Sequence, residues 1–352
     1  MKEAVFLQEV KEIQLLKNAL TLLDWDSSTG MPEKSSPFRG EVEGYLTGLY
    51  FERSIGPVIQ EALAYFETRP EELSELGKLV FEKVKEEYAL NKNVPAERMQ
   101  EYVKVLNQAH TDWLKARAAQ DFGLLEETLT KVVAFQKEFI PYWQKEEKTP
   151  YDVLLNQFEP GMTVEKLDQV FDQVKQGIQE IRTVLAEKGT PPRTDFLSRK
   201  MTKEQQRRFV IGVVEQLGYD FSKGRLDDTV HPFMTALNRN DARITTRWEE
   251  NNFSMATFGV IHEAGHGMYE QNFDPKFDFT PLSEGASMGI HESQSLFNEI
   301  IIGSNRAFWQ KQYPFFQECA EGTFDDIAFE DFYASLKETK ASLIRIDSDS
   351  LT

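Results

Sequence analysis

The sequence predicts a mainly α-helical fold with a small β-sheet, and two observations support this expectation. Apolar residues recur every three or four positions along most of the chain, which is the spacing of one helix face. Near the N-terminus these residues are Phe6, Val10, Ile13, Leu16 and Leu20. Residues 242–248 show a different pattern, in which β-branched or aromatic residues alternate with others. This alternation is typical of a β-strand.

The apolar stripes predict a series of long helices. These cover residues 2–24, 39–67, 70–91, 95–120, 122–148, 163–188 and 202–217. Pro95 suits the first turn of its helix, and Gly189 and Gly218 follow the ends of theirs. Residues 25–37 are predicted to be a turn-rich connection. Residues 191–195 are the best linker candidate, but surface-type sequence continues on both sides, so no domain boundary is predicted.

Composition restricts the class of protein. The chain has 352 residues, 40% of them hydrophobic, and a net charge of −18, so it can bury a large core. This acidic balance argues against nucleic acid and anionic membranes as partners, because both attract basic patches. The first ten residues include acidic side chains and no long apolar run, so we expect no signal peptide, and no apolar run approaches the ~20 residues of a membrane span. The single cysteine, Cys319, excludes an intramolecular disulfide and fits a reducing compartment, so we expect a cytoplasmic protein.

Residues 262–266 read His-Glu-Ala-Gly-His and carry the strongest chemical signal. Histidines four positions apart lie on one face of a helix and can bind the same Zn²⁺ ion. Glu263 can then act as general base on a metal-bound water, whose pKa the ion lowers. The motif therefore predicts metal-assisted hydrolysis, most often of peptide bonds. The alternative, two core histidines, is weaker because four of the five histidines fall between His231 and His291.

The segments around this motif have helix and strand patterns. We expect a helix over residues 255–270 with Ser254 as its N-cap and an apolar face beside the two histidines. The strand of residues 242–248 comes just before it. An exposed strand edge beside a zinc site is suited to pairing with an extended peptide. A short structural hairpin is the alternative for this strand.

A third ligand is available on the next predicted helix, residues 286–302. Glu292 follows His266 by 26 residues and would complete a His₂Glu set. His291 is a rival ligand, but it lies about 100° around the helix from Glu292. We therefore expect it to orient the site or contact substrate. Glu299 lies ~10 Å further along the helix and cannot bind the same ion; supporting and surface roles both stay open for it.

These motifs resemble the carboxypeptidase Taq family of zinc metallocarboxypeptidases. The chain has His-Pro-Phe at 231–233, Asp-Ala-Arg-Ile-Thr at 241–245, the zinc motif at 262–266, His-Glu-Ser-Gln at 291–294 and Ile-Arg-Ile-Asp-Ser-Asp at 344–349. In the last motif serine replaces the family's alanine. The resemblance covers essentially the whole chain, with the motifs in the family's order.

The resemblance implies a neurolysin-like, gluzincin-type helical metallopeptidase fold with a groove and a small β-sheet near the active site. It implies release of C-terminal amino acids from peptides by a zinc-activated water, with His262, His266 and Glu292 as ligands and Glu263 as base. Co²⁺ or Mn²⁺ could replace Zn²⁺. Residues 1–352 would form a single catalytic domain that lacks the family's C-terminal helical segment.

The resemblance also implies residues that bind substrate. Arg345 is the first candidate to hold the terminal carboxylate, since a guanidinium binds a carboxylate through two parallel hydrogen bonds. Arg243 is the second candidate, and His231 and His291 could also contact substrate. An ion pair with Asp347 or Asp349 is the alternative for Arg345, and one with Asp241 is the alternative for Arg243.

The C-terminal segment of the family, which this chain would lack, carries a Gln-Asp-x-His-Trp and a Gly-Tyr-Phe-Pro-x-Tyr sequence. Tyr313 and Tyr333 do not lie in a sequence that matches either of them. We therefore expect weakened stabilisation of the transition state. We also expect exposed apolar surface on residues 291–302 and 329–343, and hence self-association, such as a homodimer. A catalytically impaired zinc-binding module that holds peptides and an endo-acting oligopeptidase stay open as alternative functions.

Overall fold

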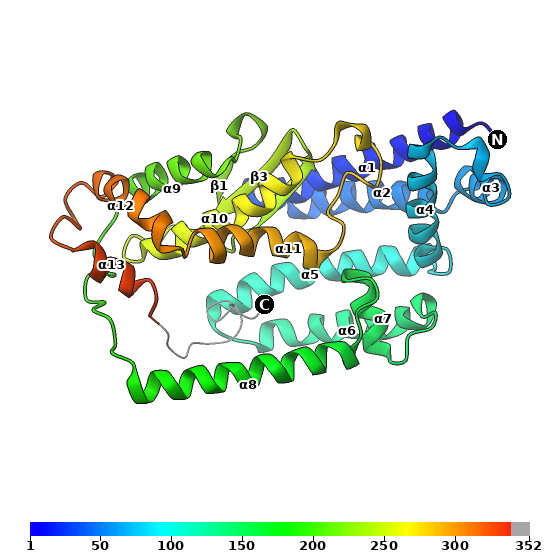
Figure 1. Cartoon of the computed structure of the whole chain (residues 1–352). Coiled ribbons are helices and arrows are strands. Elements are labelled where there is room, and N and C mark those ends of the chain that lie inside the picture. The colour runs from blue at the N-terminus through cyan, green and yellow to red at the C-terminus, as the bar shows by residue number, and fades with distance from the viewer. Residues whose placement is uncertain (339–352) are drawn as a thin grey trace. The chain divides into compact units, whose positions relative to one another are not determined.

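A computed structural model describes residues 1–338, except for the side chain of residue 33 (Figure 1). The chain forms two compact units. Unit 1 consists of Met1–Thr163 with Phe273–Ala286, and unit 2 consists of Val164–Asn272 with the described residues from Ser287 onward. Helices dominate both units, and a small sheet lies in unit 2. The expectation of a mainly α-helical fold with a small sheet is confirmed.

Unit 1 is built from helices that bury aromatic side chains. Its helices are α1 (Glu3–Thr29), α2 (Ser36–Ser54), α3 (Pro57–Phe66), α4 (Glu75–Asn91), α5 (Ala96–Ala119), α6 (Gly123–Trp143) and α7 (Pro150–Phe158), with 3₁₀ turns at Glu33–Ser35, Pro70–Glu72 and Pro275–Phe277. One buried cluster gathers around Phe6 and Phe66, and a second around Phe139 and Trp143.

Several predicted boundaries in unit 1 are wrong, and two of them show the physical reason. Residues 39–67 form α2 and α3 instead of one helix, because Pro57 cannot donate an amide hydrogen and starts a new helix behind Gly56. The expected connection at residues 25–37 begins late, since α1 continues to Thr29 and buries Trp25. The burial of that indole supports the extra helical turn.

Unit 2 contains a long helix near its start, the sheet, and a bundle around α10. Its helices are α8 (Val164–Lys188), α9 (Lys203–Leu217), the 3₁₀ turn η3 (Phe221–Lys223), α10 (Phe253–Gln271), α11 (Met288–Leu296), the π-helix η5 (Phe297–Ile302), α12 (Arg306–Cys319) and α13 (Phe329–Ser335). The core packs Phe209 of α9, Val260 of α10, Trp309 of α12 and Phe332 of α13 into one cluster. Cys319 is fully buried in the same cluster.

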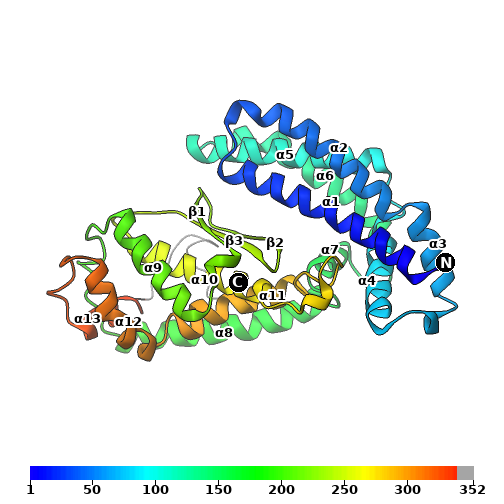
Figure 2. The same ribbon diagram turned by 90° about the horizontal axis from the view of Figure 1, so that it is seen from above.

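The sheet consists of β1 (Leu226–Asp228), β2 (Met234–Asn238) and β3 (Asp241–Thr246). Figure 2 shows β3 in the middle, parallel to β1 and antiparallel to β2. Both edges of β3 are therefore paired, and the expectation that an extended peptide adds to this strand is wrong. The alternative, a structural hairpin, describes β2 and β3. The buried side chain of Ile244 lies on the side of β3 that meets α10.

Helix α8 is amphipathic in sequence, but none of its side chains is buried. None of its 25 residues, all of them in the described part of the chain, is buried. Its exposed large apolar side chains are Val170, Phe171, Ile181, Val184 and Leu185. Within residues 1–338, no helix combines the length and the apolar character needed to cross a lipid bilayer.

Candidate metal centre

Helix α10 carries the His-Glu-Ala-Gly-His motif through the core of unit 2. Eleven of its nineteen residues are buried, which fixes its rotation and points the two histidines to one side. Its N-cap is Asn252, not Ser254 as expected, and the Ser254 hydroxyl donates a hydrogen bond of 2.7 Å to Asn252. The rings of His262 and His266 lie 5.0 Å apart, as expected one turn apart on one face.

A glycine inside the motif brings the second helix close. A Cβ atom on Gly265 would lie 2.7 Å from the carbonyl oxygen of Gln294 and 2.7 Å from the Cα of Ser295. No larger residue fits there without moving a backbone. The close approach of α11 to α10 places Glu292 beside both histidines.

The three expected ligands are together. His262 Nε2 lies 3.7 Å from Glu292 Oε1, and His266 Nε2 lies 3.4 Å from Glu292 Oε2. Two donors bound tetrahedrally at ~2.0–2.1 Å from one Zn²⁺ are about 3.4 Å apart. Within residues 1–338, no other group of three or more His, Cys, Asp or Glu side chains has donor atoms close enough for one ion. The donor set fits a divalent cation with little movement.

The other ring nitrogens agree with binding through Nε2. His262 Nδ1 donates a hydrogen bond of 2.8 Å to Glu299 Oε2. A carboxylate only accepts, so this bond leaves the lone pair of a neutral imidazole on Nε2. The Nδ1 atom of His266 is buried and has no hydrogen-bond partner within the described residues.

Glu263, the expected base, lies beside the three expected ligands. The side chain is buried next to the ligand group, and burial raises the pKa of Glu263 to about 7. The negative charges of Glu292 and Glu299 raise this pKa further, whereas His262 opposes them. A bound cation would lower it again. A carboxylate with a pKa near neutrality can take up and release a proton during a reaction.

The three expected ligands also have shifted pKa values. Burial lowers the pKa of His266, which favours the neutral imidazole that binds metals. The neighbouring imidazoles, His266 first, lower the pKa of Glu292. Burial also lowers the pKa of His262, but the hydrogen bond to Glu299 and the charges of Glu263, Glu299 and Glu292 together raise it above its ordinary value.

His291 lies beside the group but is bonded elsewhere. Its Nε2 lies 2.9 Å from Glu270 Oε1, and its ring stacks on His266 with 4.5 Å between the ring centres. Glu270 is buried one turn beyond His266 on α10. Sequence reasoning missed Glu270, although its spacing of four residues from His266 was available as a signal.

The remaining predicted residues lie outside the metal group. Arg243 on β3 makes two hydrogen bonds to Asp241, of 2.7 and 2.8 Å, so the expected alternative pairing is present. His231 is exposed in the bend before β2. Arg345 and the rest of its motif lie outside the described residues. Neither Arg243 nor His231 contributes a ligand atom to the His262, His266 and Glu292 group.

The two tyrosines of the C-terminal part have structural partners. The Tyr313 hydroxyl donates to the carbonyl of Ile327 at 2.6 Å, and the Tyr333 hydroxyl donates to the carbonyl of Ser304 at 3.2 Å. Burial raises the pKa of Tyr313 to about 12. Both hydroxyls therefore stabilise the fold of unit 2.

Exposed apolar side chains follow the ligand helix, as expected. They are Met288, Ile290, Phe297, Ile300 and Ile301. The matching expectation for residues 329–343 is wrong within residues 329–338, because Phe332 is buried in the core and Phe329 packs against it. Residues 339–343 lie outside the described part.

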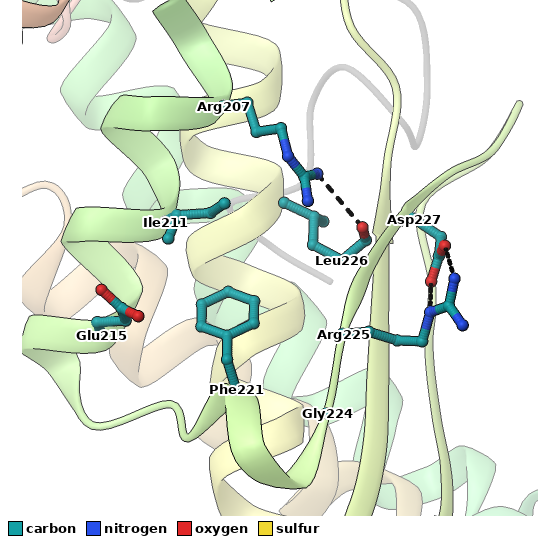
Figure 3. A pocket seen from close by; sticks show the side chains of 8 residues that line it. All are labelled: Arg207, Ile211, Glu215, Phe221, Gly224, Arg225, Leu226 and Asp227. Carbon is teal, nitrogen blue, oxygen red and sulfur yellow. Dashed lines mark hydrogen bonds and ion pairs between the residues drawn. The ribbon is translucent and has the colours of Figure 1, made fainter. Parts of the chain in front are cut away.

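A cavity of about 460 Å³ opens elsewhere on unit 2, between α9 and the segment of β1 (Figure 3). Both arginines of its lining are already engaged, since Arg225 pairs with Asp227 and Arg207 donates to the carbonyl of Leu226 at 3.3 Å. The cavity is lined by Arg207, Ile211, Glu215, Phe221, Gly224, Arg225, Leu226 and Asp227. Its lining includes none of the three expected ligands, so it is separate from the candidate metal centre.

Comparison with known sequences identifies relatives along the whole chain. The family described as Carboxypeptidase Taq (M32) metallopeptidase matches residues 5–352. Carboxypeptidase 1 of Bacillus subtilis is 43% identical over 350 residues, which are 99% of this chain and 70% of that protein. Thermostable carboxypeptidase 1 of Thermus thermophilus is 32% identical over 353 residues, covering 97% of this chain and 69% of that protein.

Solved structures agree with the sequences. The structure named "BsuCP Crystal Structure" has a TM-score of 0.95 and 42% identity, and the match covers 99% of this chain and 70% of that chain. The M32 carboxypeptidase from Deinococcus radiodurans R1 has a TM-score of 0.89 and 32% identity, and the match covers 98% of this chain and 69% of that chain. With its motifs and helical fold, the chain therefore belongs to the carboxypeptidase Taq family of metallopeptidases and has that family's metal-dependent carboxypeptidase function.

Proposed function

We propose that His262, His266 and Glu292 bind one Zn²⁺ ion and that Glu263 is the general base for hydrolysis of the last peptide bond. The observation that carries this assignment is the meeting of three ligand side chains whose donor atoms lie within 4.8 Å of one another. Two imidazoles and one carboxylate are a common Zn²⁺ set with an open fourth position. Co²⁺ and Mn²⁺ are the alternatives, since imidazole and carboxylate donors also accept them.

The ion, when bound, supplies a water of lowered pKa and polarises the substrate carbonyl. Glu263 would accept a proton from the attacking water and would pass it to the leaving amine. Burial raises the pKa of Glu263 and a bound cation opposes this shift, so the carboxylate is suited to take up the proton and to release it again. His262 and His266 are held by the buried face of α10, so they need little reorganisation during the reaction.

The substrates we propose are peptides with a free C-terminal carboxylate. Arg243 is already engaged with Asp241 through two hydrogen bonds, which supports Arg345 as the first candidate for the carboxylate. His291 is bonded to Glu270, so we propose that it supports His266 more than it contacts substrate. His231 stays a candidate for substrate contact.

We further propose a cytoplasmic protein that self-associates, with the two units acting as one catalytic domain. The single cysteine supports a reducing compartment. The exposed apolar side chains of α11 and η5 support a homodimer, because patches of this kind favour association. Sedimentation at several protein concentrations tests the homodimer.

The test of the function compares one peptide in two forms, with a free and with an amidated C-terminus. Protein stripped with a chelator and reloaded with Zn²⁺, Co²⁺ or Mn²⁺ should release the last residue of the free form only. Cleavage inside the amidated peptide would instead identify an endo-acting oligopeptidase. Zinc binding without turnover of either form would identify the impaired module. Glu292→Gln should lose the metal, and retention of one zinc per chain in that variant would contradict the ligand assignment.

A further inference from the structure

The ring of His262 lies between two carboxylates of one continuous helical segment. Its Nε2 faces Glu292 at 3.7 Å and its Nδ1 donates to Glu299 at 2.8 Å. Within the described part of the chain, His262 is the only group that bonds or pairs with the Glu299 carboxylate. The carboxylate is largely buried, with 15% of the side chain exposed. Glu299 therefore has a specific partner, which is a ligand of the proposed metal.

The backbone explains how Glu299 reaches this nitrogen. Glu292 belongs to α11, whereas Glu299 lies in the π-helix η5. A π-helical turn contains an extra residue, as the 2.7 Å hydrogen bond from Gly303 N to Asn298 O illustrates. The extra residue turns the following side chains around the axis, relative to an unbroken α-helix. Such turns are frequent at functional sites.

The hydrogen bond determines which nitrogen of His262 can bind a cation. A neutral imidazole carries its proton on one nitrogen and its lone pair on the other. With Nδ1–H donated to Glu299, the lone pair is on Nε2, which faces Glu292. Without this acceptor, the ring is free to adopt the other tautomer and to rotate, and both changes compete with metal binding.

His266, the second proposed histidine ligand, has no comparable carboxylate contact at its Nδ1 atom in the described part of the chain. His266 Nδ1 has no hydrogen-bond partner within residues 1–338, and the nearby carboxylate, Glu270, bonds to His291. Of the two histidines, only His262 has its Nδ1 atom hydrogen-bonded to a carboxylate within the described residues. This difference argues for a role specific to that ring and against general acidity of the region.

We propose that Glu299 is a positioning residue, whose carboxylate fixes the tautomer and orientation in which His262 presents Nε2 to the metal. The proposal rests on the metal site assigned under the proposed function. Glu299 is not one of the three proposed ligands and acts through His262, so its effect is expected first in metal affinity.

The test measures Zn²⁺ affinity by competition with a chromophoric chelator for wild type, Glu299→Gln and Glu299→Ala. Glu299→Ala removes the acceptor and should weaken binding about 10- to 100-fold, the usual effect of losing such a partner. Glu299→Gln keeps an oxygen acceptor but loses the charge, so its affinity should fall in between. Glu318→Gln, on the surface of α12 and paired with Arg208, is the control and should bind like wild type.

Two further measurements separate the possible failures. Unfolding temperatures in excess chelator should match for wild type and Glu299→Gln, and the visible spectrum of bound Co²⁺ should change in both Glu299 variants. The positioning role would be overturned if folded Glu299→Gln and Glu299→Ala both bound zinc within about two-fold of wild type, since loss of such a partner usually weakens binding about 10- to 100-fold. If Glu299→Ala does not fold, Glu299→Gln decides alone. If Glu292→Gln binds zinc as wild type does, the metal site itself is misassigned.

Discussion

Helices α8 and α10 have comparable lengths, but α10 is largely buried and α8 is exposed. Eleven of the nineteen residues of α10 are buried, and β3, α9 and α11 pack around it. Helix α8 has 25 residues, all described, and buries none. Both have apolar side chains at helical spacing, so this spacing predicts a helix without predicting what covers it. Whether a helix is buried depends on the other elements that pack against it. A metal site needs such packing because its ligand side chains must be held in a fixed geometry.

The comparison also separates two uses of glycine. On α10, a Cβ on Gly267 would lie 2.6 Å from the ring of Tyr219, and one on Gly265 would meet the backbone of α11. On α8, a Cβ on Gly177 would meet no atom within 4 Å. Glycine permits close packing in α10, whereas in α8 it only lowers helix propensity.

The largest expected effect comes from the buried face of α10. Glu263→Gln should bind Zn²⁺ normally and lose about 10²- to 10⁴-fold in kcat, because the amide cannot accept the proton of the water. Steady-state kinetics and zinc stoichiometry check this. Glu180→Gln on α8 is the matched control and should leave kcat unchanged. Full activity of Glu263→Gln would remove it from the mechanism.

Alanine at the two glycines should act with opposite signs. Gly265→Ala pushes α11 from α10 and should destabilise the protein by about 1–3 kcal/mol, with weaker zinc binding. Gly177→Ala should stabilise it by about 0.5–1 kcal/mol, because alanine favours the helix and nothing obstructs the methyl group. Urea unfolding measures both. Equal effects at the two positions would mean that the close approach of α10 and α11 is not a constraint.

The smallest expected effects come from removing one methyl group. Ile261→Val, in the core on α10, should cost about 0.5–1.5 kcal/mol of unfolding free energy. Ile181→Val, on the exposed side of α8, should change it by less than about 0.5 kcal/mol. Thermal unfolding resolves the difference. A cost at Ile181 as large as at Ile261 would show that α8 is covered in solution, for example in a dimer.

Much of the candidate site could be predicted because its signals are local. The four-residue spacing of His262 and His266 and the position of Glu292 on the next helix needed only helical periodicity. The partner of Glu299 could not be predicted, since a straight α-helix was assumed and the π-helix η5 changes the direction of its side chains. The proposed role of Glu263, by contrast, could be inferred from its place between the two histidines.

The errors in the fold arise from tertiary structure. The strand of residues 242–248 looked like a free edge because β1, its parallel neighbour, has only three residues and no recognisable pattern. Likewise, the end of α1 depends on the burial of Trp25, which the local sequence does not reveal. The break at Pro57 was available in the sequence and was outweighed by the apolar stripe on both sides.

The burial of Cys319 has a consequence for following the protein in solution. It is the chain's only cysteine, it is fully buried at the end of α12, and burial raises the pKa of its thiol. A thiol reagent attacks the thiolate, so it can react only when the core of unit 2 opens. The labelling rate therefore reports how often the core around α10 opens, and slower labelling on adding zinc would measure how firmly the bound ion closes it.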